Sequence, residues 1–526
     1  MTESSNSQIE VVHHWMGVRM RSLVVCWLLV TACGGKEDTG QPPRGQQAAQ
    51  DIQSTLQLAP NPNNPLSAFA TVTADADTTL RLVYGVRGED YTHATPEVPV
   101  AAGVPVELTV LGLYEGTWSV AVEIGGVAGE PASIATQTPA SFGPPTTTVL
   151  ADASRWAATE SICASREGPP AYACTDRQGR PNLYIELIGN AMFVRPLSDG
   201  TLLAHPDGAP ALWQFDTAGR EIRRIDMSDL RNTTYEHGWI DEHETVEIVE
   251  GPWAGAWAIL TATEEAGRIG AGIIVYDPAS QQVLWDWSSH GAPGDGRSID
   301  DARLPYDRQT LANYGNDWLH ANAVAHSIDA AGTDHFWMSL RHQDWVIRID
   351  APSGDIRWRL GFDGDFTLVD DLDAANPVPL SQDKWMYHQH APELRRQADG
   401  TVDMLIFDNG NVRADEQGNA TYREEYSRAV TFRVDEAAMR ASIVWSYGAP
   451  EPSAEWFFGE AAGDADRSAD EASVLITKAV NTPTIYDIDL DGTMLWTQRF
   501  TGEGELYRSE LYPSLYDIDW KAMTGW

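Results

Sequence analysis

Four stretches of the sequence set a cationic or nucleophilic side chain among apolar residues. They contain His243, His320, Arg341 and His390. An imidazole is near neutral at physiological pH, is nucleophilic at one ring nitrogen and can be oriented through the other. An arginine supplies a permanent charge and a planar fork that matches two oxygens of an anion. These residue types could bind a tetrahedral anion and attack it, provided that the fold brings them together.

Each of these residues lies near the start or end of a predicted strand, and we expect the four to come from different hairpins. His390 precedes a turn at residues 398–400 and an apolar strand at residues 404–407. From about residue 149 onward a weak repeat recurs, in which an apolar strand, an aspartate and a turn lead to a second strand that usually carries tryptophan. Five copies are anchored by Asp216, Asp277, Asp350, Asp435 and Asp489. Their spacing exceeds the ~40–50 residues of common propeller repeats, which fits four-stranded blades with inserted loops. Because a propeller gathers its inner strands at a central channel, the four side chains can converge there.

The rest of the chain also predicts an all-β fold. Residues 61–148 alternate apolar and polar side chains between turn signals, which predicts a small antiparallel β-sandwich. Residues 149–526 are assigned to the propeller, and segments near residues 150–205 and at the C-terminal tail would complete the ring. Helix signals are sparse and lie chiefly at residues 436–440. We therefore expect a β-sandwich followed by a β-propeller.

The N-terminal residues predict export. Residues 19–33 have a basic start and an apolar run that is short for a membrane span, so residues 1–33 are interpreted as an export signal. Residues 30–33 resemble a bacterial lipobox, which implies cleavage before Cys33 and lipid on that cysteine; an unlipidated signal peptide is the alternative. Residues 34–60 are rich in Gly, Gln and Pro and are predicted to be a flexible tether. The expected location is the periplasm or the cell surface, with membrane contact only through the lipid.

Charge and cysteine content narrow the partners and the compartment. The formal net charge of −40 argues against nucleic acid as a partner, because like charges repel at long range. Apart from Cys26 in the signal and Cys33, the cysteines are Cys163 and Cys174. In an oxidising compartment this pair predicts a disulfide that is worth about 3 kcal/mol by loop closure.

At this point the sequence resembles the bacterial arylsulfotransferases, which move a sulfuryl group between phenols without a nucleotide donor. The resemblance covers roughly residues 55 to 500 and is carried by the ordered motifs His320-Ala321-Asn322-Ala323-Val324, Ser339-Leu340-Arg341-His342-Gln343, Gln389-His390-Ala391, Phe407-Asp408-Asn409-Gly410 and Tyr426-Ser427-Arg428-Ala429-Val430. It implies six propeller blades, small aryl sulfate and phenol substrates, and no organic cofactor or metal. It leaves the oligomeric state open, with a homodimer among the options.

The resemblance also implies residue roles. His390 occupies the position of the nucleophile that becomes a transient sulfohistidine, while His243, His320 and Arg341 occupy positions that cradle the sulfate. One departure concerns His243, since the family's His-His-Asp stretch is Glu242-His243-Glu244 here. Glu244 would repel an anionic substrate unless it points away or orients His243.

Several features have structural interpretations. His342 and His388 neighbour the proposed site and are interpreted as residues that shape it, whereas Arg428 is either catalytic or part of an ion pair within a blade. Residues 487–492 imitate the start of a calcium loop, but position 498 is Gln and not the final Glu ligand, so a hairpin turn is predicted. Two rival functions remain: a quinone-cofactor propeller dehydrogenase and a non-catalytic surface-binding propeller.

Overall fold

The computed structural model describes residues 52–518 apart from residues 144, 167–169, 190, 207–210, 227–229, 231–237, 266, 291–316, 330, 352, 419–425, 449–456, 469, 481 and 501–505. The described residues all belong to one compact unit, Ala48–Trp526. The predicted export signal, its Cys33 and residues 34–51 of the predicted tether lie outside them. The tether was predicted to extend too far, because Ser54–Pro60 is strand β1 and pairs with β2 (Ala68–Ala74). No helix in the described part of the chain is long and apolar enough to cross a membrane.

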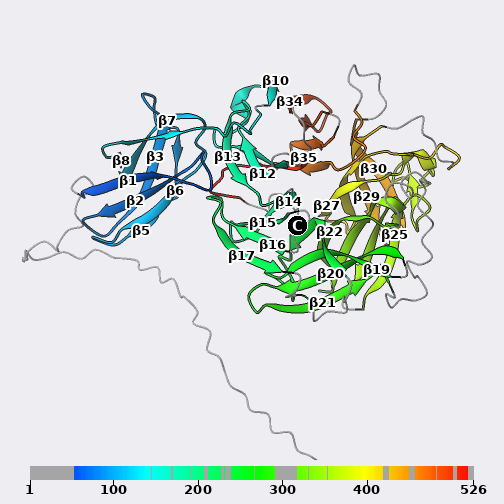
Figure 1. Cartoon of the computed structure of the whole chain (residues 1–526). Coiled ribbons are helices and arrows are strands. Elements are labelled where there is room, and N and C mark those ends of the chain that lie inside the picture. Colours follow the sequence, from blue (N-terminus) through cyan, green and yellow to red (C-terminus); the bar gives the residue numbers. More distant parts are fainter. Residues whose placement is uncertain are drawn as a thin grey trace, which may run out of the picture. The chain divides into compact units, whose positions relative to one another are not determined.

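Residues 54–136 form two antiparallel sheets around a shared apolar core. One sheet has the order β1, β2 and β6 (Val106–Val110). The other is built on β3 (Thr78–Val86) and β7 (Gly116–Ile124), and its remaining strands are β4 (His93–Ala94), β5 (Val98–Val100), β8 (Val127–Ala128) and β9 (Ala132–Thr136). Alternate residues of β2 are buried, as a half-buried strand requires, and Trp118 of β7 fills the core between the sheets. This arrangement agrees with the predicted β-sandwich (Figure 1).

The later residues form sheets of four or five strands. Written from the outermost to the innermost strand, the six sheets of the described residues are β13 (Pro181–Glu186), β12 (Ala171–Thr175), β11 (Ser161–Arg166) and β35 (Leu506–Tyr512); β17 (Glu221–Asp226), β16 (Ala211–Phe215), β15 (Leu202–Pro206) and β14 (Ala191–Pro196); β21 (Gln282–Ser288), β20 (Arg268–Asp277), β19 (Trp257–Glu265) and β18 (Gly238–Glu247); β25 (Asp355–Gly361), β24 (Trp345–Asp350), β23 (Asp334–Leu340) and β22 (Ala321–Ile328); β26 (Thr367–Val369), β30 (Arg440–Tyr447), β29 (Arg428–Asp435), β28 (Val402–Asp408) and β27 (His390–Arg396); β10 (Thr146–Val149), β34 (Met494–Arg499), β33 (Thr484–Asp489), β32 (Ser473–Lys478) and β31 (Asp464–Arg467).

The innermost strands contact one another in a closed series. β14 contacts β18, β18 contacts β22, β22 contacts β27, β27 contacts β31, β31 contacts β35, and β35 contacts β14. An apolar cluster also joins each sheet to the next, as where Ile273 of β20 and Phe336 of β23 share one cluster. The core therefore lies between the faces of neighbouring sheets. The inner edges of the sheets are left to carry polar side chains.

The five predicted hairpins are confirmed as the third and fourth strands of their sheets: β16–β17, β20–β21, β24–β25, β29–β30 and β33–β34. The calcium-loop imitation is the turn between β33 and β34, as predicted. The C-terminal strand β35 pairs with β11, and Figure 1 shows it in red beside the cyan strands of that sheet. β14 and β15, however, belong to the following sheet. The predicted disulfide is also present, between Cys163 of β11 and Cys174 of β12.

The helix signal at residues 436–440 was wrong. Residues 436–439 form the turn between β29 and β30. The Asp435 carboxylate accepts hydrogen bonds from the backbone N–H groups of Ala437 and Ala438, which favours a turn over a helix. Met439 then adopts a left-handed conformation (φ 52°) and returns the chain to β30.

Candidate active site

The structure brings the four sequence-predicted site residues together. The ring centroids of His243 and His320 are 4.9 Å apart, and Tyr507 of β35 lies 5.8 Å from the ring of His243 and 6.2 Å from that of His390. The charges of Arg341, His243 and His320 all act on His390. Three histidines and one arginine from separate parts of the chain therefore surround one site.

The expectation that each residue comes from a different hairpin unit was wrong for one pair. His320 directly precedes β22, and Arg341 directly follows β23 in a 3₁₀ turn, so both belong to one sheet. The backbone N–H of Arg341 donates to the carbonyl oxygen of His320 at 3.0 Å. This bond fixes the spacing of the two side chains more directly than packing between sheets would.

His390 begins β27 and is buried, with 2% of its surface exposed. Its Nδ1 lies 2.6 Å from Oδ1 of Asn409, a fully buried residue that follows β28. Burial lowers the pKa of His390 well below its usual value, and the positive charge of Arg341 lowers it further. His390 is therefore a neutral imidazole at physiological pH.

His243 and His320 both have a carboxylate at Nδ1. His243 contacts Asp241, which also accepts the backbone N–H of His243, and His320 Nδ1 lies 2.6 Å from Asp317 Oδ2. Burial raises the pKa of Asp241, but the attraction of His243 and its hydrogen bonds outweigh burial and keep that pKa below its usual value. Burial and then the neighbouring His243 and Arg341 hold the pKa of His320 well below its usual range. A bound anion would act in the opposite direction and favour protonated histidines.

Arg341 is held by two acceptors. Its Nη1 lies 3.0 Å from Nε2 of His342, and its Nη2 donates to the carbonyl oxygen of Glu460 at 3.0 Å. His342 Nδ1 lies 2.7 Å from the carbonyl oxygen of Asp317, so His342 donates there and accepts from Arg341. Burial, followed by His320 and Arg341, lowers the pKa of His342 to about 2, which keeps it neutral. The interpretation of His342 as a residue that shapes the site agrees with these contacts.

Four non-glycine residues of the site have left-handed backbones. They are His320 (φ 47°), Asp344 (φ 55°), His388 (φ 53°) and Ala391 (φ 52°). The Asp344 carboxylate accepts the backbone N–H of His388 at 2.8 Å and so ties two of these positions together. Such conformations cost about 1–3 kcal/mol each and are concentrated at functional sites, where surrounding contacts hold them in place.

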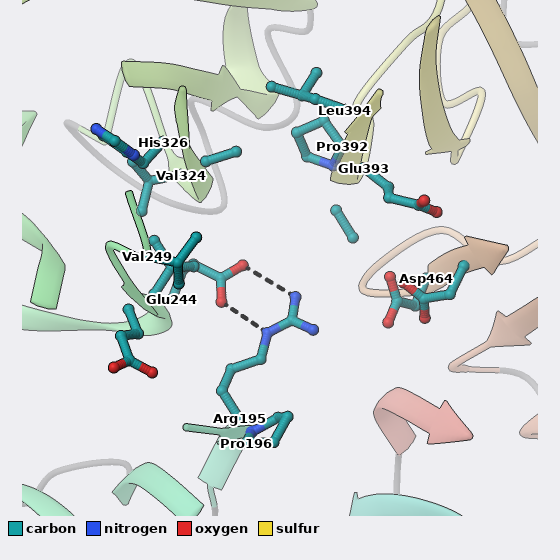
Figure 2. Close-up of a pocket in the computed structure, with 15 residues that line it drawn as sticks. Arg195, Pro196, Glu244, Val249, Val324, His326, Pro392, Glu393, Leu394 and Asp464 are labelled. Atoms are coloured by element: carbon teal, nitrogen blue, oxygen red, sulfur yellow. Dashed lines mark hydrogen bonds and ion pairs between the residues drawn. The ribbon is translucent and has the colours of Figure 1, made fainter. Parts of the chain in front are cut away.

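Glu244 points away from the histidines. Its carboxylate pairs with Arg195, with Nε–Oε1 at 3.1 Å, and with Arg508 of β35. Figure 2 shows Arg195 reaching Glu244 beside a cavity of about 100 Å³, with Asp464 among the residues that line it. The two arginines lower the pKa of Glu244 despite its burial, so the carboxylate is ionised and neutralised. The repulsion that its sequence position suggested is therefore relieved.

Arg428 has structural contacts. Its Nε pairs with Asp408 Oδ2 at 2.8 Å, and its Nη2 donates to the carbonyl oxygen of Lys384 at 2.7 Å. Arg413 pairs with the same carboxylate oxygen at 2.8 Å. These bonds hold the segment that leads to His388 and His390, which supports the ion-pair interpretation of Arg428.

Three residues at the site were not assigned a role from the sequence. Asp317 and Asn409 lie within or beside the motif stretches, but only the fold shows that each faces a histidine Nδ1. Tyr507 lies in a strand without any motif and gave no signal.

One group at the site has the composition of a metal site. Donor atoms of Asp317, His320 and His342 lie within 4.8 Å of one another. The rings of His320 and His342 are stacked, however, with centroids 4.6 Å apart and planes at 27°. Both nitrogens of His342 also bond to protein atoms, so we assign no metal to this group.

Fold and site together define a class: an all-β protein that presents a cluster of neutral histidines and an arginine suited to a tetrahedral anion. The family model described as Arylsulfotransferase (ASST) matches residues 150–493, more than half of the chain. The chain belongs to the arylsulfotransferase family, which confirms the resemblance seen in its motifs.

Individual relatives are more distant. Arylsulfate sulfotransferase AssT of Escherichia coli O6:H1 is 30% identical over 149 residues, which cover 26% of this chain and 23% of that protein. The chain thus matches about a quarter of the length of this relative. A protein of unknown function from Bacteroides caccae is similar with a TM-score of 0.37 and 12% identity, covering 67% of this chain and 98% of that one. Streptogramin B lyase gives a TM-score of 0.31 and 12% identity, covering 69% and 86% of the two chains.

Proposed function

We propose that this protein transfers a sulfuryl group from an aryl sulfate donor to a phenolic acceptor by a ping-pong reaction through sulfohistidine at His390. The observation that carries the proposal is the convergence of His243, His320, Arg341 and His390 on one site. Membership of the arylsulfotransferase family supports the same activity. The chemistry uses side chains alone, and the donor and acceptor are small molecules.

In the first half-reaction, Nε2 of His390 attacks the sulfur of the donor. The N–S bond forms as the bond from sulfur to the aryl oxygen breaks, and the electron pair of that bond leaves on the phenolate. A proton from His243 or His320 neutralises the phenolate. Arg341 donates to the peripheral sulfuryl oxygens, which carry charge in a loose, in-line transition state.

In the second half-reaction, the acceptor phenol attacks the sulfur of sulfohistidine. Its proton returns to the histidine that protonated the leaving group. The N–S bond breaks and its electron pair returns to Nε2 of His390, which regenerates the enzyme. A covalent intermediate of this kind gives ping-pong kinetics.

The proposal extends to architecture and location. The six sheets with their closed series of inner strands are the blades of a six-bladed propeller that follows the sandwich. The chain is an exported lipoprotein of a bacterial envelope that is anchored through Cys33. It acts without nucleic acid partners.

The test is a colour assay with p-nitrophenyl sulfate as donor and phenol as acceptor. We expect nitrophenol release that depends on the acceptor and, without acceptor, a burst of one nitrophenol per active site. His390→Ala should abolish both signals, while His93→Ala in the sandwich serves as a histidine control that keeps them. Full transfer by His390→Ala would refute the assignment.

The same assay separates the rival functions. Sustained release without acceptor would indicate a sulfate esterase, and no release would indicate a binding protein. A cofactor absorbance in the purified protein would favour the quinone-dependent dehydrogenase.

A further inference from the structure

We propose that Asn409 is a positioning residue that fixes His390 as a neutral imidazole with its proton on Nδ1, and that the group facing each Nδ1 divides the work among the three histidines. This inference rests on the proposed function and adds to it. It explains why chemically identical rings in one site take different roles: His390 attacks sulfur, whereas His243 and His320 carry protons and charge.

The orientation of the Asn409 amide follows from its partners. Its Nδ2 donates to two carbonyl oxygens, those of Gly459 and Ala462, each at 2.8 Å. An amide nitrogen has two hydrogens, so both are used and the remaining atom, Oδ1, faces His390. A carbonyl oxygen cannot donate, and the 2.6 Å contact therefore places a proton on Nδ1 of His390. The lone pair of the ring is left at Nε2, the atom that must attack.

The loop that carries Asn409 is itself fixed. The Ser427 hydroxyl donates to the carbonyl oxygen of Asn409 at 2.7 Å and accepts the backbone N–H of Gly459 at 2.8 Å. Ser427 and Asn409 are fully buried, so water does not compete for these groups. The amide is a rigid acceptor, prepared before the substrate arrives.

The partners of the other two histidines differ in charge. Asp241 faces Nδ1 of His243, and Asp317 faces Nδ1 of His320. A carboxylate stabilises an imidazolium at this position, whereas an uncharged amide does not. The groups that face His390 oppose its protonation further, because Arg341, His243 and His320 are all cationic or potentially cationic. Tyr507, the remaining ring in contact with His390, is a neutral phenol because burial raises its pKa.

The uncharged partner also serves the second half-reaction. Attack through Nε2 leaves the sulfohistidine ring positively charged, and this charge makes the imidazole a good leaving group. A carboxylate at Nδ1 would neutralise that charge and stabilise the intermediate, whereas Asn409 leaves it in place. The asparagine therefore favours both formation and breakdown of the N–S bond.

The experiment compares wild type with Asn409→Asp in the burst assay without acceptor, from about pH 5.5 to 8.5. We expect a nearly flat burst rate for wild type. In Asn409→Asp the new carboxylate raises the pKa of His390, so the burst rate should fall at least about tenfold as pH drops, since each unit below a pKa costs tenfold in the deprotonated form. Transfer to phenol should also slow in this variant. Asn182→Asp, which alters another buried asparagine, on β13, is the matched control and should keep the flat profile.

A second measurement does not depend on activity or on the stability of a variant. In wild-type protein labelled with ¹⁵N-histidine, the resonances lost in His390→Gln should be those of a neutral ring protonated at Nδ1. A ring protonated at Nε2, or a flat profile in folded Asn409→Asp, would overturn the inference. If wild type gives no burst, the proposed function fails, and the resonances still decide the role of Asn409.

Discussion

Glu244→Gln tests whether the carboxylate beside His243 belongs to the channel and not to the substrate site. Glu244 is buried, and its two oxygens contact Arg195 at 3.1 and 3.4 Å and also Arg508, whose side chain is 3% exposed. Removing one partner of a buried pair costs about 3–5 kcal/mol, because the remaining charge stays buried without compensation. Arg195 keeps Glu510 as a partner, and glutamine still offers one acceptor, so we expect a loss of about 3 kcal/mol at pH 7.

The pH dependence of this loss has a defined sign. The pKa of Glu244 is lowered in the folded protein, mainly because the two arginines outweigh burial. The stability it contributes is therefore present above its unfolded pKa, about 4.5, and disappears as pH falls through its folded pKa. Wild type and Glu244→Gln should differ at pH 7 and approach each other in acid.

The assay is urea unfolding followed by tryptophan fluorescence, together with the KM for the donor. Glu221→Gln is the control, because Glu221 pairs with Arg224 while their side chains are 47% and 42% exposed; such pairs contribute about 0–1 kcal/mol. If Glu244→Gln matched Glu221→Gln in stability but changed the KM strongly, Glu244 would face the substrate and the reasoning would be refuted.

Three further predictions concern other parts of the molecule. Arg341→Lys should lower kcat at least about 100-fold, because it removes a donor fork from the sulfuryl oxygens; Arg428→Lys should lower the unfolding midpoint instead, and equal losses of kcat in both would contradict the assignment. Replacing Cys163 and Cys174 by alanine together should cost about 3 kcal/mol of stability, measured by urea unfolding against wild type under the same conditions. Asp466→Asn should unfold at higher urea than wild type at pH 8 and equally near pH 4, because burial and then the neighbouring carboxylates raise the pKa of Asp466 and its ionisation destabilises the fold as pH rises; parallel pH curves would exclude this effect.

The local pattern of the sequence predicted most of the strands, because alternation, turn residues and the aspartate that ends a strand act within about ten residues. The hairpins around Asp277 and Asp350 follow this pattern and occur in the structure. The pattern at residues 436–440 favoured a helix in isolation. The side chain of Asp435, which binds the next backbone N–H groups, decided for a turn.

The contacts of the site depended on long-range geometry that no local pattern contains. Glu244 follows a register shift in β18, between Ile240 and Thr245, and therefore its direction could not be read from simple alternation. Its partner Arg508 lies 264 residues away in sequence. The order of the motifs identified the histidines, but only the folded chain shows which atoms face each Nδ1.

The role of β35 has a consequence for how this protein matures. The strand pairs with β11, near the start of the ring, and supplies Tyr507 to the histidine cluster and Arg508 to Glu244. Residues 506–512 are synthesised after the other inner strands, so a nascent chain lacks both groups throughout most of its elongation. Catalytic competence should thus arise in a single late step, and a polypeptide that is still being made or threaded through a translocation channel would remain inert toward sulfate esters.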